Sequence, residues 1–563
     1  VVSVKDFGAV GDGVADDTAA IQAAIDYAQS LVTSSLGATG DPVRGQTVHL
    51  AGAYRITDTL KVTSSNVGIQ GESGSSLLID FSSTAGYNGA KPALIIGADW
   101  SASIGNVAKY NSVSKLLFKR CTNSSPGFIG VLLTGTRNCT IRELLFEKAE
   151  VGVYYENTSE CLTEQVSVIG STYGYICDSK YSRAASDTVL NKASGENDFS
   201  SNRFDMCIAY YISKTGMLLM GVGSTQVTGC TFGHNGTTAT GAGFLPSHPT
   251  QHAGVVIQGD GQSVRGVLLQ NIVFEPDSSQ TTMSTCALLL AGSSKMTGVT
   301  LDNCIVQTYK SYLGASPLNS DAPVSQLLKI DGTANTIENV LVRGSGFIHS
   351  STGNYFGRMV EQNRPANLRF ERCFPAVAFS TSRMDSGASI EDFVPVETVT
   401  DTVAFTPSGW GDTGNVSGCS IVTANGSPHY RRFTGNTSDI HISKSVTFSE
   451  QVFEMYGPAV LLTYRGNAEP YIVFRVNGQP DTYSNIINTT NIARYSNAII
   501  PHTTSTTFKT VLICFGSFDA SYDFTAAAFY IGRKANASSS SYVDIRRIQL
   551  GYMRGRSTGY LSS

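Results

Sequence analysis

Two acidic side chains hold equivalent places in two similar segments of this chain, at a spacing that suits acid–base chemistry. The segments are Gly152-Val-Tyr-Tyr-Glu-Asn and Gly174-Tyr-Ile-Cys-Asp-Ser, which carry Glu156 and Asp178. If both are strands that stack in register, the two carboxyl groups share an outer face about 4.8 Å apart. Such closeness raises the pKa of one carboxyl group, which suits a general acid in glycoside hydrolysis. We expect Glu156 to be the acid and Asp178 the base or nucleophile.

The same stacking predicts aromatic surfaces beside the carboxyl groups. If Ala209-Tyr-Tyr-Ile-Ser is the next strand, Tyr211 shares the outer face with Tyr154, and both rings offer flat surfaces to sugars. The opposite interpretation is that Glu156 and Asp178 are solvated residues at strand ends. Because a slip of one residue in register would turn these side chains inward, the sequence leaves both interpretations open.

A second group of polar side chains follows the last Phe of several repeats. Glu147, Asp205 and Glu275 occupy that place, and Arg203 and His234 lie close to them in the sequence. Asp205 and Glu275 would be two coils apart, roughly 10 Å, which is the long end for an inverting pair of carboxyl groups. We therefore expect Asp205 as a third catalytic candidate, and Arg203, His234 and Glu275 in substrate binding.

Short apolar strands separated by turns recur from about residue 115 to 375. Examples are Ile141-Arg-Glu-Leu-Leu-Phe, Gly229-Cys-Thr-Phe and Leu269-Gln-Asn-Ile-Val-Phe. This periodicity predicts a solenoid with one coil per interval. After Phe374 the repeat fades, and the later strands predict an antiparallel β-sandwich. The expected organisation is a strand and capping helix over residues 1–45, a parallel β-helix over 46–376, a linker over 377–400 and the β-sandwich over 401–563.

The composition is typical of an all-β protein with many turns. The chain has 563 residues, of which 56 are Gly and 15% are charged, and its formal net charge is −4. It has no basic stripe that would predict a nucleic-acid partner, and no apolar run reaches the roughly 18 residues of a membrane span. The 11 cysteines include no CxxC pair. Many fall in apolar runs, so we expect buried reduced thiols, no metal site and no cofactor.

The N-terminal segment Val4-Lys-Asp-Phe-Gly-Ala-Val-Gly-Asp-Gly predicts a short strand and glycine turns that lead into a helix. Asp16 or Asp17 can cap that helix. Its apolar stripe consists of Ile21, Ala24, Ile25 and Ala28. We expect the helix to cover the open hydrophobic end of a coiled sheet. The segment resembles the N-terminal signature of the pectate-lyase-like right-handed β-helix superfamily, whose members nearly all act on polysaccharides.

Within that superfamily, the order of cap, β-helix and terminal β-sandwich resembles bacteriophage tailspike depolymerases. Polygalacturonase motifs are missing, since Gly233-His-Asn is only a fragment of Gly-His-Gly. The resemblance implies a homotrimer that hydrolyses a bacterial surface polysaccharide, capsule or O-antigen, during host recognition. It also implies a place in the virion tail, after synthesis in the bacterial host cytoplasm, and action at the bacterial cell surface. A phage baseplate or other tail protein would bind through a short or missing N-terminal region, since Val1 suggests a trimmed start.

Two other functions on the same scaffold stay open. A polysaccharide lyase needs a base such as Lys, Tyr or His and a cation that neutralises a uronate carboxylate. The side chains available for this chemistry are Lys180, Tyr181, Arg183, Arg203 and His234. A glycan-binding adhesin would use the tyrosine-rich strands to hold its receptor without cleaving it.

Overall fold

The computed structural model describes residues 1–32, 45–81, 91–97, 108–122, 127–178, 200–235, 253–259, 263–275, 285–290, 294–308, 325–331, 337–349, 357–362, 368–371, 373, 378–381, 389–390, 393–399, 411–412, 419–424, 430–435, 440–446, 455–468, 470–476, 505–514, 527–533 and 540–554. The chain divides into two compact units. Unit 1 comprises Val1–Asp277, Cys286–Cys304 and Gly332–Ile337, and unit 2 comprises Ser278–Thr285, Ile305–Asp331 and Glu338–Ser563.

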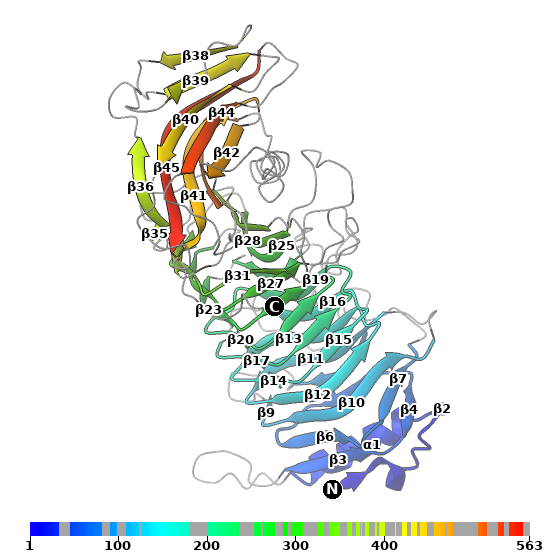
Figure 1. Ribbon diagram of the computed structural model, residues 1–563. Helices are drawn as coiled ribbons and strands as arrows, with labels where there is room; N and C mark the ends of the chain where they lie inside the picture. The colour runs from blue at the N-terminus through cyan, green and yellow to red at the C-terminus, as the bar shows by residue number, and fades with distance from the viewer. Residues whose placement is uncertain are drawn as a thin grey trace, which may run out of the picture. The chain divides into compact units, whose positions relative to one another are not determined.

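Unit 1 is a parallel β-helix whose coils follow one another from blue to green in Figure 1. Its strands form three parallel sheets, named A, B and C here. Sheet A contains β1 (Val2–Ser3), β3 (Gln46–Leu50), β6 (Val67–Gly71), β10 (Ser112–Arg120), β12 (Thr140–Glu147), β14 (Leu162–Glu164), β17 (Arg203–Asp205), β20 (Gln226–Thr228), β23 (Val264–Gln270) and β26 (Met296–Asp302).

Sheet B shares the long strands β10 and β12 with sheet A. Its other strands are β2 (Asp12–Asp16), β4 (Ala53–Ile56), β7 (Ser76–Ile79), β15 (Ser167–Ile169), β18 (Ile208–Tyr210), β21 (Thr231–Gly233) and β24 (Val273–Glu275). Sheet C contains β5 (Leu60–Val62), β8 (Lys91–Ile96), β9 (Ala108–Lys109), β11 (Phe128–Arg137), β13 (Val151–Ser159), β16 (Tyr173–Asp178), β19 (Thr215–Met220) and β22 (Ala253–Gln258).

A residue in the left-handed conformation makes the corner between sheets A and B in successive coils. Gln165, Met206, Gly229, Asn271 and Asn303 hold this place, with φ between 50° and 63°. Asn and Gly adopt this conformation at lower cost than other residues. The corner therefore explains the Asn that recurs before the last strand of several sequence repeats.

A cysteine follows the corner residue in several coils. The thiols of Cys207, Cys230 and Cys304 lie 3.4, 3.3 and 3.8 Å from the carbonyl oxygen two residues earlier. Eight cysteines have described side chains; all eight are free thiols, and seven of them are buried. The expected burial is confirmed for those seven.

Aromatic side chains fill the interior of the β-helix. Tyr155 and Tyr175 point inward from sheet C, as strand alternation predicted, and their ring centroids lie 5.2 and 6.0 Å from that of Phe204 in sheet A. Tyr175 Oη donates hydrogen bonds to the carbonyl oxygens of Val166 and Ile208, at 2.7 and 3.1 Å. Burial raises the pKa of both phenols, so both remain protonated donors.

Helix α1 (Thr18–Ser30) covers the N-terminal end of unit 1, as the sequence predicted (Figure 1). Its buried face consists of Ile21, Ala24, Ile25 and Ala28. Asp17 is the N-cap residue, but its carboxylate accepts hydrogen bonds from the backbone N–H groups of Val10 and Gly11, at 2.6 and 3.0 Å. Asp16 accepts the N–H of Thr18 at 3.1 Å. Asp17 thus fixes the glycine turn, and Asp16 caps the first N–H group of the helix.

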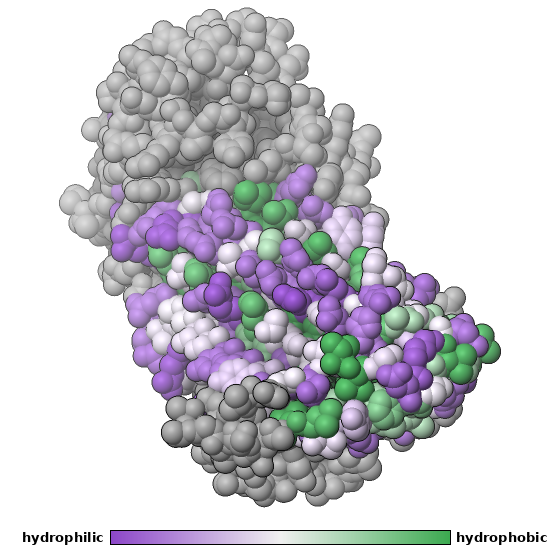
Figure 2. Space-filling model, turned by 90° about the horizontal axis from the view of Figure 1, so that it is seen from below, coloured by the Kyte–Doolittle hydropathy of each residue, from purple (hydrophilic) through white to green (hydrophobic). Residues whose placement is uncertain are grey.

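The segment expected as the first strand is instead the 3-10 helix η1 (Val4–Phe7), because the Ser3 side chain accepts the N–H of Lys5 and Gly8 ends the turn with φ 89°. Figure 2 shows unit 1 from below, with green apolar patches scattered among purple polar side chains. Among the described residues, no helix is long and apolar enough to cross a membrane.

A ladder of glycines runs through sheet C. Gly130, Gly152, Gly174, Gly216 and Gly254 follow one another in neighbouring strands. A Cβ added to Gly152 would lie 2.8 Å from the carbonyl oxygen of Gly174, and one added to Gly216 would lie 2.6 Å from that of Gly254. Only glycine allows successive backbones to approach so closely at this bend.

Unit 2 contains parallel strand pairs followed by antiparallel sheets. The parallel pairs are formed by β27 (Ile305–Thr308), β28 (Ser325–Asp331), β30 (Val340–Arg343), β31 (Gly346–His349), β32 (Gly357–Gln362), β33 (Leu368–Glu371), β34 (Ala378–Thr381) and β35 (Ser389–Ile390). Strands β25 (Thr285–Leu290) and β29 (Ile337–Glu338) span the sequence boundaries of the units.

The antiparallel strands of unit 2 form two sheets, as the sequence predicted. Sheet D contains β36 (Phe393–Val399), β38 (Cys419–Ala424), β39 (Tyr430–Gly435), β41 (Met455–Gly466), β43 (Ser505–Cys514) and β45 (Tyr542–Arg554). Sheet E contains β37 (Gly411–Asp412), β40 (Ile440–Val446), β42 (Pro470–Val476) and β44 (Ala527–Arg533).

The range 377–400, expected as a linker, contains the strands β34, β35 and β36. Strand β36 pairs with β45, and the register shifts between Pro395 and Glu397. Proline is tolerated in a strand at such an irregularity, so the proline content of this range did not prevent pairing. The expected linker is therefore corrected to strands of unit 2.

Candidate active site

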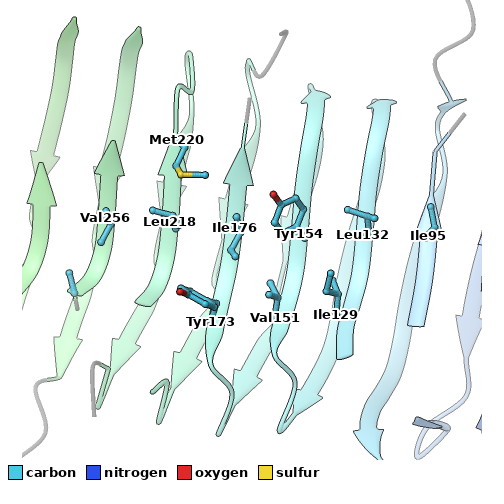
Figure 3. Packing of buried hydrophobic residues seen from close by; sticks show 11 residues of the cluster. Ile95, Ile129, Leu132, Val151, Tyr154, Tyr173, Ile176, Leu218, Met220 and Val256 are labelled. Carbon is cyan, nitrogen blue, oxygen red and sulfur yellow. The ribbon is translucent and has the colours of Figure 1, made fainter. Parts of the chain in front are cut away.

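The outer face of sheet C brings Glu156 and Asp178 side by side. Strands β13 and β16 pair in parallel, with Glu156 opposite Asp178 and Tyr154 opposite Ile176. Figure 3 shows Tyr154 and Ile176 on neighbouring strands within one packed layer. The predicted stacking of the two acidic residues is confirmed, and about 4.8 Å separates their strands.

This face is buried, which corrects the expectation of an open carbohydrate surface. Glu156 and Asp178 are each 1% exposed, and Tyr154 is fully buried. Tyr154 Oη donates a hydrogen bond to Asp178 Oδ2 at 3.2 Å, so its ring packs inside the protein instead of offering a surface to sugar. Periodicity tells which side chains share a face, but it does not tell what covers that face.

Apolar side chains surround the buried pair. The packed layer of Figure 3 consists of Ile95, Ile129, Leu132, Val151, Tyr154, Tyr173, Ile176, Leu218, Met220, Ala253 and Val256. The in-register row that holds the pair runs through Thr134, Glu156, Asp178, Met220 and Gln258. All five are buried. Buried carboxyl groups of this kind occur both at functional sites and in structural networks.

Tyr211 does not share a sheet with Tyr154, which corrects the predicted stacking. The strand that pairs with β16 in sheet C is β19, whereas Ile208–Tyr210 forms β18 in sheet B. Both segments follow a turn and are mainly apolar, so their side-chain pattern could not assign them to different sheets.

Asp205 and Glu275 also lie on different sheets, so the predicted pairing of these two carboxyl groups on one face, two coils apart, is wrong. Asp205 ends β17 in sheet A, and Glu275 ends β24 in sheet B. Glu147 lies in the row of sheet B that contains Glu275. The error arose because strands of both sheets end with an inward Phe and an outward acid, as in Phe204-Asp and Phe274-Glu.

The neighbour of Asp205 in sheet A is Glu164, a residue that the sequence analysis missed. Strands β14 and β17 pair Glu164 with Asp205. Thr163 and Phe204 are buried toward the interior, so alternation directs both carboxyl groups outward. Both acids are partly exposed, and Arg203 is exposed on the same face. This arrangement is an accessible acidic pair one strand apart with a guanidinium beside it.

A second accessible cluster lies at the end of sheet B. Tyr210 pairs with Gly233, which pairs with Glu275 in the next coil. Because Gly233 has no side chain, the Tyr210 ring lies across it, and Tyr210 Oη donates a hydrogen bond to Glu275 Oε2 at 2.7 Å. The carboxylate of Glu275 is thereby held at the surface.

Tyr211 and His234 complete this cluster. They occupy left-handed corners after β18 and β21, with φ 54° and 49°, and their ring centroids lie 4.8 Å apart. Both rings also contact Tyr210, with centroids 4.8 and 4.9 Å away. Tyr211 is 54% exposed. The predicted binding residues Tyr211, His234 and Glu275 thus lie together, and their rings can stack on a sugar.

Strand β18 links the acidic pair to the aromatic cluster within one coil. It begins just after Asp205 and ends at Tyr210, and its outer side carries the exposed Ile208. We name this surface the β18 strip. It consists of Glu164, Arg203, Asp205, Ile208, Tyr210, Tyr211, His234 and Glu275.

Glu150, just before β13, provides a test of charge burial in unit 1. Burial raises the pKa of its carboxyl group above the ordinary 4.5, although Thr172 Oγ1 donates a hydrogen bond to its Oε2 at 3.0 Å. The folded protein therefore retains this proton where the unfolded chain has lost it, so stability falls as pH rises from 4.5 through the raised value. We expect Glu150→Gln to unfold at a higher temperature than the wild type at neutral pH, with no such gain well below pH 4.5.

Thermal unfolding over a pH series measures this difference. Glu160→Gln is the matched control, because the Glu160 side chain is 51% exposed and its replacement should shift the midpoint little at any pH. A Glu150→Gln midpoint that differs from the wild type by the same amount at every pH would contradict the prediction.

Comparison with known proteins adds a family match over part of the chain. Residues 1–195 match the family model described as "Rhamnogalacturonase A/epimerase, pectate lyase-like". The mannuronan C5-epimerases AlgE1 and AlgE5 of Azotobacter vinelandii are each 54% identical to this chain over 56 residues, which are 10% of this chain. The chain spans only 3% and 4% of the lengths of these two curated relatives.

Solved structures with similar architecture differ widely in sequence. ORF18 of Geobacillus virus E2 is 16% identical, with a TM-score of 0.37 and coverage of 78% of this chain and 75% of that one. Tailspike protein 4 of bacteriophage CBA120 is 11% identical, with a TM-score of 0.38 and coverage of 98% and 68%. The A-module of mannuronan C-5 epimerase AlgE4 of Azotobacter vinelandii is 14% identical, with a TM-score of 0.41 and coverage of 69% and 99%. Unit 1 of this chain is a parallel β-helix, and residues 1–195 match a pectate-lyase-like family model.

Proposed function

We propose that this protein is an endo-acting glycoside hydrolase that cleaves a polysaccharide along the β18 strip. The observation that carries the proposal is the in-register pair of Glu164 and Asp205 on an accessible face of sheet A. Glycoside hydrolysis requires two carboxyl groups that flank the scissile bond. Strands about 4.8 Å apart bring such groups close to the roughly 5 Å separation that retaining enzymes use.

In this mechanism one carboxylic acid protonates the glycosidic oxygen while the other, as a carboxylate, attacks the anomeric carbon. The bond to the leaving sugar breaks, and a glycosyl ester forms on the protein. Water then attacks that ester, and the first group, now a carboxylate, takes the proton of the water. Both carboxyl groups return to their starting states, so no cofactor is consumed.

The rest of the β18 strip would hold the polymer on either side of the cleaved bond. Arg203 can donate several hydrogen bonds to sugar hydroxyl or carboxylate oxygens. Tyr211 and His234 can stack on sugar rings, and Glu275, oriented by Tyr210, can accept hydrogen bonds from hydroxyl groups. A site spread over several neighbouring coils suits an internal segment of a long chain, which is why endo action is proposed.

The buried pair of Glu156 and Asp178 is the alternative acid–base pair. It has the same in-register stacking as the accessible pair, and its apolar surroundings resemble those of many catalytic acids. Each residue is 1% exposed, however, so a polymer has no direct access to the pair. We therefore place it second.

A polysaccharide lyase is the second candidate function, because phenol and imidazole groups of the kind that abstract protons lie together in the cluster of Tyr210, Tyr211 and His234. Arg203 would neutralise a uronate carboxylate. Lys180, Tyr181 and Arg183, also named for this reaction, lie outside the described residues.

We further propose that the enzyme is a homotrimeric phage tailspike depolymerase that attacks a capsule or O-antigen at the bacterial surface. A parallel β-helix followed by antiparallel sheets supports this role, since the order of cap, β-helix and terminal β-sandwich resembles that of tailspike depolymerases. The proposed partner is a baseplate or other tail protein of the virion.

An assay for new reducing ends on purified capsular and O-antigen polysaccharides tests the proposal, with ultraviolet absorbance recorded on the same samples. Hydrolysis gives reducing ends without added absorbance. Reducing ends accompanied by the absorbance of an unsaturated sugar would show that the protein is a lyase and not a hydrolase. Binding of a polymer without either signal would favour the adhesin function.

A further inference from the structure

In unit 2 a buried aspartate holds two arginines across three strands of sheet D. Strands β39 and β41 flank β45, and the register places Arg432, Asp544 and Arg465 in one row. Asp544 is fully buried. Arg432 Nε and Nη2 donate hydrogen bonds to its Oδ1 and Oδ2 at 2.7 and 2.9 Å, and Arg465 Nε donates to Oδ2 at 2.9 Å. The hydrogen bonds to Asp544 raise the pKa of Arg432, so this guanidinium is charged at every working pH and fixed in place.

Aromatic rings alternate with guanidinium groups around this aspartate. We name the set the arginine–aromatic row, which runs through Tyr542, Arg432, Tyr430, Arg465, Phe508 and Arg546. Each guanidinium carbon lies over a neighbouring ring, at 4.5 to 5.6 Å from the ring centroid. Contacts of this length between cation and ring hold both partners in defined orientations.

The row lies on the solvent side of sheet D. All six side chains of the row are partly exposed, whereas Phe433, Val543 and Ile545, which alternate with them on β39 and β45, are fully buried. The row carries three guanidinium groups, and the carboxylate of Asp544 binds two of them, those of Arg432 and Arg465. Asp544 thus orients these two cations on the solvent side of the sheet.

We propose that the arginine–aromatic row binds an anionic polysaccharide through its carboxylate-bearing sugar residues. A guanidinium binds a carboxylate with two parallel hydrogen bonds, and a flat ring packs against the apolar face of a sugar. Because Asp544 and the rings hold the arginines before the ligand arrives, binding costs little side-chain entropy. This site belongs to unit 2 and takes no part in bond cleavage, so it goes beyond the proposed hydrolase and does not depend on it.

Calorimetric titration of the full chain with polygalacturonate, an anionic polymer, tests the inference, with neutral dextran and duplex DNA titrated in parallel. We expect polygalacturonate to bind, and dextran to bind with a Kd at least about tenfold higher. The reason is that dextran has no carboxylate, so it loses the charge-assisted hydrogen bonds to arginine. Arg546→Gln and Phe508→Ala should each weaken polygalacturonate binding by about tenfold, since each removes one partner at the edge of the row. Asp544 is left unchanged, because its loss would uncouple both arginines and destabilise the sheet.

Arg547→Gln is the matched control, because Arg547 is exposed and adjacent in sequence but is not a member of the row. It should change the Kd by less than about twofold, as a screened surface charge does. Equal weakening by Arg547→Gln and Arg546→Gln would overturn the inference in favour of unspecific attraction, and tighter binding of DNA would overturn it in favour of nucleic acid. Reducing ends counted in the same samples separate this result from the hydrolase proposal, since binding and cleavage are read independently.

Discussion

Replacing Asp205 by asparagine is expected to slow polysaccharide cleavage roughly 10²- to 10⁴-fold, the usual loss when a positioned acid or base is removed. The asparagine has the same shape, but it can neither attack as a carboxylate nor exchange a proton at working pH. Asp205 is partly exposed at the end of β17, so the fold should tolerate the change, with an unfolding midpoint near that of the wild type. Initial rates of reducing-end formation, taken with thermal unfolding of the same preparation, measure the two effects separately.

Asp302→Asn is the control for this experiment. Asp302 lies in the same sheet A row as Asp205, three strands further on, where Gln270 Nε2 donates a hydrogen bond to its Oδ2 at 3.0 Å. The chemical change is identical, but the residue is not part of the proposed pair. Equal losses of turnover in the two variants would mean that Asp205 contributes only surface charge, and the proposed chemistry at this place would then be wrong.

The second large effect is expected from Gly174→Ala, which should destabilise unit 1 by about 3 kcal/mol, the upper range for overpacking a filled site. A Cβ at this place collides with the carbonyl oxygen of Gly216 in the next coil and lies 2.9 Å from the Cβ of Ala209. Backbone atoms cannot move aside as a flexible side chain can, so sheet C would have to separate locally. The midpoint of denaturant unfolding, followed by far-ultraviolet circular dichroism, measures the loss.

Gly170→Ala separates this collision from the ordinary cost of replacing a glycine. Gly170 has φ 61°, and a Cβ added there meets nothing closer than Lys148 Cγ at 4.0 Å. The expected cost is only that of the left-handed backbone, about 1 kcal/mol. If Gly174→Ala cost no more than Gly170→Ala, close stacking of the coils would not be what requires the glycine ladder.

Much of the fold could be predicted from the sequence, because its signals are local. Alternation in Gly152-Val-Tyr-Tyr-Glu-Asn and in the segment that contains Asp178 set the correct register between β13 and β16. The apolar stripe of α1 and the glycine turns before it gave the N-terminal cap. Assignment to sheets was less accurate, because β17 of sheet A and β24 of sheet B are both only three residues long and both end with an outward acid after an inward Phe.

The candidate site was predictable only in part. Tyr211, His234 and Glu275 do lie together, yet the reason is the contact of Tyr210 across Gly233, which no periodic pattern reveals. Glu164 was missed because its strand, Leu162-Thr-Glu, lacks the Phe that marked the other repeats. The outward acid at its end was the available signal. Burial of Glu156 could not be predicted, since strand alternation tells which face a side chain is on and not how exposed that face is.

The most direct test of the proposed catalytic pair compares two carboxyl pairs with equal stacking but different exposure. Glu164→Gln and Asp205→Asn alter the accessible pair of sheet A, and Glu156→Gln and Asp178→Asn alter the buried pair of sheet C. The measurement is the rate of polysaccharide cleavage per folded molecule for all four variants. We expect losses of roughly 10²-fold or more for the accessible pair, and near wild-type rates for folded protein with either buried substitution. The reverse result, with cleavage lost in sheet C and kept in sheet A, would contradict the proposed catalytic pair.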